Sequence, residues 1–281
     1  MNHDLPILCQ RIKLLLLFLM MGLSAYIEEV GASPTSVIIE IHNISSLKSH
    51  ISPNTLILFD IDNTLIEPVQ TLASDQWFCW RIEHYESLGN KHPEALDMAL
   101  MEWSAAVNMT KVKEVEPSAH ELIEYLQSNN YIVMGLTTRS PSLSTATIKQ
   151  LKSVQIQLLQ TAPSKEEVIF LNPREVIYKN GILFTAGTNK GNALLNLFTL
   201  INQKLPEKVL FINDKKSHLK QVQQACEDNN ISFIGLRYDY LDRKVQEFSQ
   251  DIAEYQLQHF SKLLSDDETR KAIDELAAKP L

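Results

Sequence analysis

The stretch LILFDIDNTL, residues 56–65, decides the fold because an apolar strand runs directly into two aspartates. Leu56 to Phe59 are apolar at every position, which is typical of a short strand that is buried on both faces. Asp60 and Asp62 follow at once, and a carboxylate at such a place is costly unless another group pairs with it. Asp and Asn also favour turns and helix caps, so the stretch alone fits either a simple turn or a metal and nucleophile site.

Strand and helix patterns alternate along most of the chain. The other apolar segments that are typical of buried core strands are residues 36–41, 131–136, 208–213 and 231–238. The segments between them carry apolar residues at helical spacing. This alternation predicts an α/β fold with a Rossmann-like, doubly wound parallel sheet. Such sheets bind ligands at the carboxyl ends of their strands, so the residues that follow each strand are the candidates for a site.

Two insertions interrupt the alternation. Residues 72–88 carry one helical stripe, and Leu96, Leu100 and Trp103 begin a second, so we expect an inserted helical cap at about residues 68–116, after the strand that precedes Asp60. A second, smaller insertion is expected at about residues 168–186. There, Asn180-Gly181 is a strong signal for a two-residue turn and predicts a β-hairpin.

The first 32 residues differ from the rest of the chain. Arg11 and Lys13 precede an apolar run from Leu14 to Ala25, which is too short to span a bilayer comfortably. This pattern predicts a signal peptide over residues 1–32, followed by an exported domain over residues 33–281. The alternative is a protein anchored to the membrane by an uncleaved N-terminal segment. After cleavage, no stable membrane insertion is expected.

Composition excludes some classes of function. The formal net charge of −8 argues against a nonspecific nucleic-acid binder. Of the three cysteines, Cys9 lies in the expected signal peptide, so Cys79 and Cys226 could form one disulfide or stay as two buried thiols. The second alternative is favoured because the spacing indicates no disulfide framework.

The residues expected at the strand ends together resemble the four motifs of the haloacid dehalogenase-like (HAD) hydrolase superfamily. The first motif is matched by the DIDNT segment at 60–64, and the second by Thr137 in GLTTR. The third is matched by Lys190 in NKGNAL, and the fourth by Asp214 in FINDKK. The resemblance covers about residues 36–240 and is greatest to secreted bacterial acid phosphatases and to uncharacterised proteins related to them.

The resemblance implies a Mg²⁺-dependent phosphomonoester hydrolase that acts on a small phosphorylated substrate. Asp60 would attack phosphorus and form an aspartyl-phosphate. Asp62 would protonate the leaving group and later activate water. Thr137 and Thr138 would bind phosphate oxygens, and Lys190 would offset the negative charge of the site and contact the substrate.

The same resemblance implies a metal site. Mg²⁺ would lie between the carboxylates of Asp60 and Asp214 and the main-chain carbonyl of Asp62, because this cation prefers oxygen ligands. The fourth motif usually carries two acids, whereas Asn213 precedes Asp214 here. This departure motivates one alternative, a degenerate relative that binds a phosphorylated ligand or a protein partner without turnover. A second alternative is a phosphotransferase that passes the phosphoryl group to an alcohol.

Several further side chains keep two interpretations at this stage. Arg139 could contact the substrate or cover a helix end, and His218 could support the site or lie on a solvated helix face. An aromatic group in the expected cap could line a substrate pocket or form part of the core: Trp77, Trp80, His84 and Tyr85.

Overall fold

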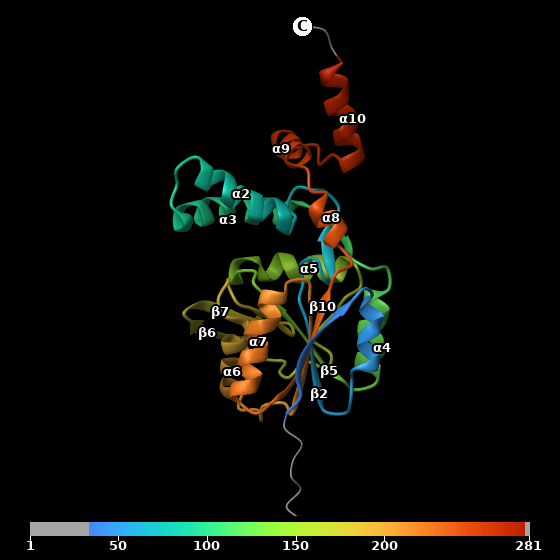
Figure 1. The fold of residues 1–281 in the computed structure, drawn as a ribbon, viewed down its shortest axis with the longest axis vertical. Helices are drawn as coiled ribbons and strands as arrows, with labels where there is room; N and C mark the ends of the chain where they lie inside the picture. The colour runs from blue at the N-terminus through green and yellow to red at the C-terminus, as the bar shows by residue number, and fades with distance from the viewer. Residues whose placement is uncertain (1–33, 279–281) are drawn as a thin grey trace, which may run out of the picture. The chain divides into compact units, whose positions relative to one another are not determined.

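The computed structural model describes residues 34–278 (Figure 1). Its centre is an eight-stranded sheet with the order β1-β10-β9-β2-β5-β8-β7-β6. The strands are β1 (Ser36–Ile41), β2 (Thr55–Phe59), β5 (Ile132–Thr137), β6 (Val168–Asn172), β7 (Arg174–Lys179), β8 (Ile182–Phe184), β9 (Lys208–Asn213) and β10 (Ser232–Tyr238). From β1 to β8 every neighbouring pair is parallel, so the expected α/β fold with a mostly parallel sheet is confirmed.

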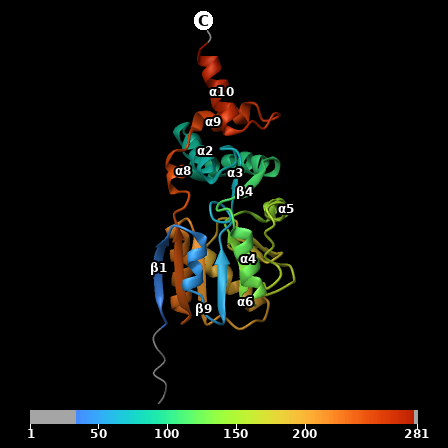
Figure 2. The same cartoon turned by 90° about the vertical axis from the view of Figure 1, so that its right-hand side faces the viewer.

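Helices cover both faces of the sheet (Figures 1 and 2). Leu56 and Leu58 of β2 pack with α6 (Lys190–Leu200) and α7 (Lys216–Asp228). Ile57 and Phe59 point the other way and pack with helices on the opposite face. The elements of that face are η1 (Ile44–Ser49), α4 (Ala119–Ser128) and α5 (Ser144–Ser153), the last preceded by the short turn η2 (Pro141–Leu143). All five residues of β2 are buried, as its apolar sequence predicts.

The segment expected as a small hairpin insertion extends the main sheet. Strand β7 runs antiparallel to both β6 and β8, while β8 pairs parallel with β5. A simple doubly wound sheet would be parallel throughout, whereas this sheet has antiparallel pairs on both sides of β7. Asn180 and Gly181 join β7 to β8 with φ of 53° and 76°, and Lys179 pairs with Ile182 across them. Asn and Gly tolerate these left-handed dihedrals, which explains the tight turn.

Two helices rise from the chain between β2 and α4. Strands β3 (Ile66–Pro68) and β4 (Val112–Glu114) form an antiparallel pair that carries α2 (Asp75–Ser87) and α3 (His92–Met109). We call the segment from β3 to β4 the cap. Both views place α2 and α3 beyond the sheet, at its carboxyl-end side (Figures 1 and 2). Trp77, on α2, is fully buried in an apolar cluster that the cap shares with Leu143 and Ala253, which answers one of the open questions about the aromatic group.

The C-terminal helices pack on the cap. They are α8 (Asp242–Gln246), α9 (Gln250–Gln258) and α10 (Asp266–Ala277). Gln256 on α9 is buried, accepts a hydrogen bond from Leu72 N at 2.9 Å and donates one to Asp266 at 2.8 Å. Helical sequence after residue 242 predicts these elements, but their contact with the cap was not expected. A polar bridge of this kind fixes two segments about 180 residues apart in the sequence.

The expected signal peptide lies outside the described residues. Among residues 34–278, no helix combines the length and apolarity that a membrane crossing needs. Cys226 is buried and Cys79 is exposed, and both are free thiols. The expectation of two buried thiols is therefore wrong for Cys79, which is exposed on α2 with its Sγ 4.0 Å from Asp75 Oδ2.

Candidate active site

The carboxyl ends of three neighbouring strands bring the candidate residues together. Strands β9, β2 and β5 lie side by side in the sheet and end at Asn213, Phe59 and Thr137. The Asp60 N–H donates to the Ile212 carbonyl at 3.0 Å, so the ladder between β2 and β9 continues one residue past the strand. Asp60 therefore begins the loop at a fixed point beside the fourth-motif segment.

Three side chains surround the Asp60 carboxylate, which is nearly buried. Lys190 Nζ lies 3.0 Å from Oδ1, and Asn213 Nδ2 donates to Oδ2 at 2.9 Å. His218 Nδ1 lies 3.9 Å from Oδ2. Burial opposes the charged form, but Lys190 and His218 more than offset it and hold the pKa of Asp60 well below its ordinary value. Asp60 is therefore an ionised carboxylate at neutral pH, the form that acts as a nucleophile.

Lys190 is fully buried in the first turn of α6. Burial lowers the pKa of Lys190, and the Asp60 carboxylate opposes that shift. The ammonium group makes no well-aligned hydrogen bond to any residue in the described part of the chain. Its N–H groups can therefore bind an oxygen of a substrate that lies next to Asp60.

A close approach of two helices places Lys190. The main-chain N–H of Lys190 donates to Gln221 Oε1 on α7 at 2.9 Å. A Cβ atom at Gly191 would clash with the Gln221 carbonyl and with the Ala225 side chain. Only glycine lets the start of α6 lie this near α7, so the residue after the candidate lysine has a structural reason to be glycine.

Asp214 supplies a second carboxylate at the same strand end. Its burial and the neighbouring charges of Asp60 and Asp75 raise the pKa of Asp214 to about 7. Asn63 Nδ2 lies 3.4 Å from its Oδ2. The positive charges of Lys215 and Lys190 offset this repulsion only in part, and a divalent cation would offset more of it.

The donor set can be compared with what Mg²⁺ requires. Within residues 34–278, no three His, Cys, Asp or Glu side chains converge closely enough to hold a metal ion by themselves. Mg²⁺, however, keeps several waters and is usually bound through one or two carboxylates. Asp60 and Asp214 provide those two, and main-chain oxygen would have to complete the site. The residues present fit Mg²⁺ on these terms.

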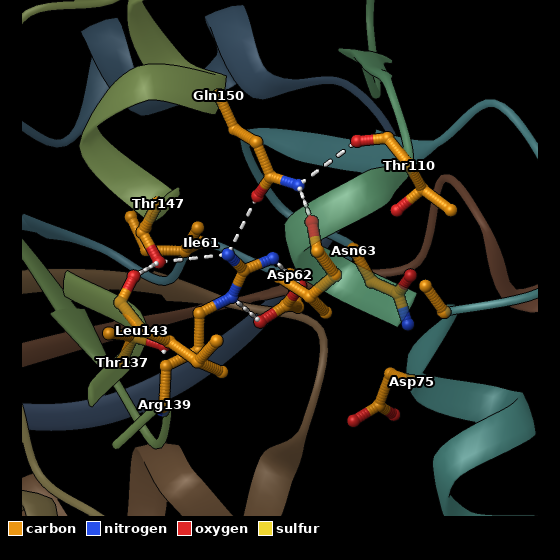
Figure 3. A network of polar contacts seen from close by, with 12 residues as sticks. Ile61, Asp62, Asn63, Asp75, Thr110, Thr137, Arg139, Leu143, Thr147 and Gln150 are labelled. Carbon is orange, nitrogen blue, oxygen red and sulfur yellow. Dashed lines mark hydrogen bonds and ion pairs between the residues drawn. The ribbon is translucent and has the colours of Figure 1, made fainter. Parts of the chain in front are cut away.

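The Asp62 side chain is not directed at Asp214. Arg139 Nε donates to Asp62 Oδ2 at 2.8 Å, and Arg139 Nη2 donates to Oδ1 at 2.7 Å (Figure 3). Both carboxylate oxygens are thus engaged by one guanidinium, the two-pronged geometry that is strongest for this pair. The Asp62 side chain is therefore not available as a metal ligand in this arrangement, and only its main-chain carbonyl could serve.

Arg139 is itself held in place from the core. Its Nη1 donates to Thr147 Oγ1 at 2.9 Å and to Gln150 Oε1 at 2.8 Å, both on α5 (Figure 3). Gln150 then donates to the Val107 carbonyl at 2.9 Å, at the end of α3 in the cap. The guanidinium also lies 5.5 Å from the Trp103 ring. One buried network thus joins Asp62 to both the core and the cap.

The second-motif threonines take different places. Thr137 is buried, and its Oγ1 accepts the Arg139 N–H at 3.1 Å, which is turn chemistry within its own segment. The Thr137 hydroxyl can still donate its hydrogen to another oxygen. Thr138 lines the cleft described next.

A cleft of about 700 Å³ opens above this strand end, between the cap and the core. Asp62 and Arg139 lie in its lining. The cap wall is formed by Phe78, Leu96, Leu100 and Trp103. Phe78 and Trp103 also contact each other, with ring centroids 5.3 Å apart. Trp80, His84 and Tyr85 are absent from this lining, so they do not form the pocket that was one of their two interpretations.

A second ion pair joins the cap to the fourth-motif segment. Lys215 Nζ lies 2.7 Å from Asp75 Oδ2, at the first residue of α2. Burial lowers the pKa of Lys215, but Asp75 more than offsets this and raises the pKa above its ordinary value. Neither residue was predicted as part of the site. The position of Asp75 directly after the N-cap Ser74 suggests a helix start, and only the fold brings it to Lys215.

From the sequence, Arg139 could either contact the substrate or cover a helix end. Its position two residues after Thr137 was the available signal, since residues that follow strand ends line the site. His218 was expected on a solvated helix face, and it instead approaches Asp60 and is mostly covered.

Comparisons with known proteins bear on the family and on the fold. A protein of Chlamydia trachomatis serovar D, named "Putative outer membrane protein", is 28% identical over 228 residues, which are 81% of this chain and 85% of that protein. A HAD-superfamily hydrolase from Ehrlichia chaffeensis gives a TM-score of 0.36 at 16% identity, covering 70% of this chain and 97% of that one. The class C acid phosphatase from Bacillus anthracis gives 0.34 at 17% identity, covering 81% and 82%.

The family is shown by a match over most of the chain. The profile of the family described as "Protein of unknown function (DUF2608)" matches residues 38–270. The chain belongs to this family. The matched region contains the cap, most of the C-terminal helices and the whole sheet except the first two residues of β1.

Proposed function

We propose that this protein is a phosphomonoester hydrolase of the HAD type that works through an aspartyl-phosphate. The observation that carries the proposal is the environment of Asp60, an ionised carboxylate at a strand end with the buried Lys190 ammonium 3.0 Å away. A cleft reaches this strand end, and Asp62 lies in its lining. A nucleophile, a cation and a second carboxylate are the groups that phosphoryl transfer needs.

In the first step, an oxygen of Asp60 attacks phosphorus and the bond from phosphorus to the ester oxygen breaks. The departing alkoxide takes a proton from Asp62, so the alcohol leaves neutral. Lys190 and the Thr137 hydroxyl bind phosphoryl oxygens and offset the charge that develops on them. For this step Asp62 must carry a proton, and its ion pair with Arg139 must therefore loosen when substrate is bound.

In the second step, water attacks phosphorus and the bond from phosphorus to the Asp60 oxygen breaks. Asp62, left as a carboxylate by the first step, takes a proton from the water, and it returns to its ion pair with Arg139 only after it has released this proton to solvent. Phosphate leaves, and the Asp60 carboxylate is restored. The arrangement in the structure, with Asp62 ionised and held by Arg139, matches the state that is ready to act as this base.

Mg²⁺ fits the proposal as the cofactor. Asp60, Asp214 and the main-chain carbonyl of Asp62 would hold it. Bound there, it would neutralise part of the negative charge shared by the phosphoryl group and the two carboxylates.

A second candidate function is binding of a phosphorylated ligand without turnover. Two contacts favour it: Asn213 stands where the superfamily motif usually has an acid, and Arg139 occupies both oxygens of Asp62. If Asp62 never leaves Arg139, the leaving group receives no proton. The protein would then bind phosphate beside Lys190 and release it unchanged.

We also propose that the protein is exported as a mature domain without its first 32 residues. The basic residues and short apolar run of that segment support this, and so does the name of the Chlamydia trachomatis relative. N-terminal sequencing of the protein recovered from its natural host would test the proposal. A chain that still begins at Met1 in the membrane fraction would contradict it.

Hydrolysis of p-nitrophenyl phosphate by residues 33–281, with and without Mg²⁺, tests the enzymatic proposal. We expect turnover that requires Mg²⁺ and that falls by more than about 1000-fold in Asp60→Asn, because the nucleophile is lost. Circular dichroism should show that the variant is folded. Asp60→Asn activity within ten-fold of the parent would exclude the assigned role. Phosphate binding by calorimetry with no turnover would favour the second candidate.

A further inference from the structure

The wall that the cap contributes to the cleft is largely apolar, and Asp62 lies in the same lining. Leu96, Leu100 and Trp103 lie on one face of α3, and Phe78 joins them from α2. Trp103 is almost fully buried, whereas Phe78, Leu96 and Leu100 are half-buried and keep surface open to the cleft. Half-buried apolar side chains that line a pocket beside polar groups are typical of a ligand site.

The position of Asp62 fixes which part of a substrate meets this wall. In the proposed reaction Asp62 protonates the ester oxygen, so the alcohol oxygen must lie beside Asp62. Asp62 and the cap wall line the same cleft, and Arg139, which holds Asp62, lies 5.5 Å from the Trp103 ring. The first carbons of the alcohol must therefore lie against the cap wall.

The charged side chains of the cleft are mostly engaged, and its uncharged polar side chains, Thr138, Ser140, Thr188 and Asn189, come from the core and not from the cap. Asp62 is paired with Arg139, and Asp75 is paired with Lys215. Arg174, on the wall opposite the cap, is the remaining charged side chain of the lining, and its Nη1 lies 3.5 Å from the Ala186 carbonyl. A sugar phosphate would place several hydroxyls against Leu96, Leu100 and Phe78, where they would lose hydrogen bonds to water without replacement.

We propose that the natural substrates are phosphomonoesters of apolar alcohols, with an alkyl or aromatic group packed against Phe78, Leu96, Leu100 and Trp103. This inference rests on the proposed phosphatase function and deepens it. The cleft volume of about 700 Å³ accommodates an alcohol of this kind together with its phosphate.

A series of n-alkyl phosphates from ethyl to hexyl tests the proposal, because all members share nearly the same leaving-group chemistry. With Mg²⁺ present, kcat/KM should rise about two- to four-fold for each added methylene, the usual gain for burying one such group. Butyl phosphate should be preferred over glycerol 3-phosphate. A flat series, or a preference for glycerol 3-phosphate, would overturn the inference while leaving phosphatase activity established.

Two neighbouring residues of α3 provide matched variants. Leu100 faces the cleft, whereas Met101 is 74% exposed and is absent from the lining. Leu100→Ser should lower the hexyl-to-ethyl ratio of kcat/KM several-fold, and Met101→Ser should leave this ratio as in the parent. Equal ratios in the two variants would show that the alkyl group does not meet the cap wall.

Binding of n-alkylphosphonates, which cannot be hydrolysed, separates this inference from the phosphatase proposal. Titration calorimetry should show affinity for hexylphosphonate well above that for ethylphosphonate, even in a protein with no turnover. If no phosphomonoester is hydrolysed, the proposed function fails, and affinity that grows with chain length still supports the apolar site. Equal affinities for the two phosphonates would refute the apolar site whatever the activity.

Discussion

Arg139 holds both carboxylate oxygens of Asp62, at 2.8 Å through Nε and at 2.7 Å through Nη2. The guanidinium side chain is 1% exposed, and its remaining nitrogen is bound by Thr147 and Gln150 on α5. Arg139 therefore cannot follow Asp62 if the carboxylate turns toward a substrate. The orientation of Asp62 is set by a fixed partner, which makes Arg139 a positioning residue for the proposed acid and base.

Replacing Arg139 tests this role. Arg139→Lys keeps a positive charge but loses the two-pronged contact, because an ammonium group is a point donor without the planar fork. We expect kcat to fall about 10- to 100-fold, the usual scale for a group that orients another, while KM changes less than three-fold. A large fall in kcat with little change in KM distinguishes this role from a purely structural one. A purely structural role would lower the amount of folded protein and leave kcat and KM of the folded molecules unchanged.

Arg237 offers a matched control for this substitution. It forms a similar two-pronged pair with Asp242, at 2.7 Å and 2.8 Å, outside the cleft. Arg237→Lys should leave kcat per folded molecule close to the parent value. Comparable losses of kcat in both variants would mean that arginine pairs support the fold in general and that Arg139 has no special relation to Asp62.

Gly191 allows the close contact between α6 and α7 that places Lys190. Gly191→Ala would put a methyl group against the Gln221 carbonyl, so either the helices separate or the start of α6 shifts. We expect a loss of about 1–3 kcal/mol in the free energy of unfolding, the usual cost of overpacking. Lys190 should move from Asp60, so kcat should fall in the fraction that remains folded.

Urea unfolding and single-substrate kinetics on the same samples check this prediction. Asn192→Ala is the control, because Asn192 is the next residue of the same helix turn and its side chain is exposed. It should change stability by less than about 0.5 kcal/mol. If Gly191→Ala is as stable and as active as Asn192→Ala, the contact between α6 and α7 does not determine the position of Lys190.

The sequence predicts the meeting of Asp60 and Asp214 for a simple reason. In a parallel sheet the carboxyl ends of all strands share one edge, so residues that follow strands converge even when about 150 positions separate them. The same rule placed Thr137 correctly at a strand end, but it does not say which way a side chain turns. Thr137 Oγ1 accepts a hydrogen bond from Arg139 N in its own turn.

Other features could not be predicted because periodicity identifies a buried face and not its partner. The sequence of α9 indicates a buried face, yet the contact of Ala253 with apolar residues of the cap follows only from the fold. Similarly, Asn180-Gly181 predicts the turn between β7 and β8 but not the pairing of β8 with β5. The Arg139–Asp62 pair depends on two side-chain rotations, which no spacing records.

Asp214 should make the stability of the metal-free protein depend on pH. The folded protein keeps the Asp214 proton up to about pH 7, whereas an unfolded chain releases it near pH 4. The folded state therefore binds more protons between these values, and its stability falls as pH rises through that window. Asp214→Asn removes this loss, so the variant should be more stable than the parent at pH 8 and nearly equal to it at pH 4.

The difference at pH 8 should be on the order of 1–3 kcal/mol, less than the ~4 kcal/mol of three full pKa units, because the side chain is partly exposed. Thermal melting of both proteins in EDTA at pH 4 and pH 8 measures this stability difference. The contributions of other titrating groups are the same in parent and variant, so they cancel in the difference. Added Mg²⁺ should raise the melting temperature of the parent and have little effect on the variant. If the Asp214→Asn variant is less stable than the parent at pH 8 in EDTA, the raised pKa of Asp214 in the folded protein is contradicted.

Asn213 is the point at which this chain departs from the motif it resembles, and its contacts explain how the amide is accommodated. Asn213 Nδ2 donates to Asp60 Oδ2 at 2.9 Å, and its Oδ1 accepts the Lys215 N–H at 2.7 Å. An aspartate could keep the second contact but not the first, because an ionised carboxylate has no hydrogen to donate. It would also add a negative charge directly beside Asp60.

Asn213→Asp should therefore have opposite effects with and without metal. In EDTA the variant should unfold at a lower temperature than the parent, since two adjacent carboxylates repel each other. With Mg²⁺ the added charge should tighten metal binding about 10- to 100-fold, the usual range for groups next to the ligands. Activity at limiting Mg²⁺ should rise with it, and activity at saturating Mg²⁺ should change less. A Mg²⁺ titration of both proteins, followed by hydrolysis rate and by melting temperature, decides the matter. An active parent whose Mg²⁺ dependence is the same in Asn213→Asp would show that the fourth motif is misaligned, and Asp214 would lose its proposed role as a ligand.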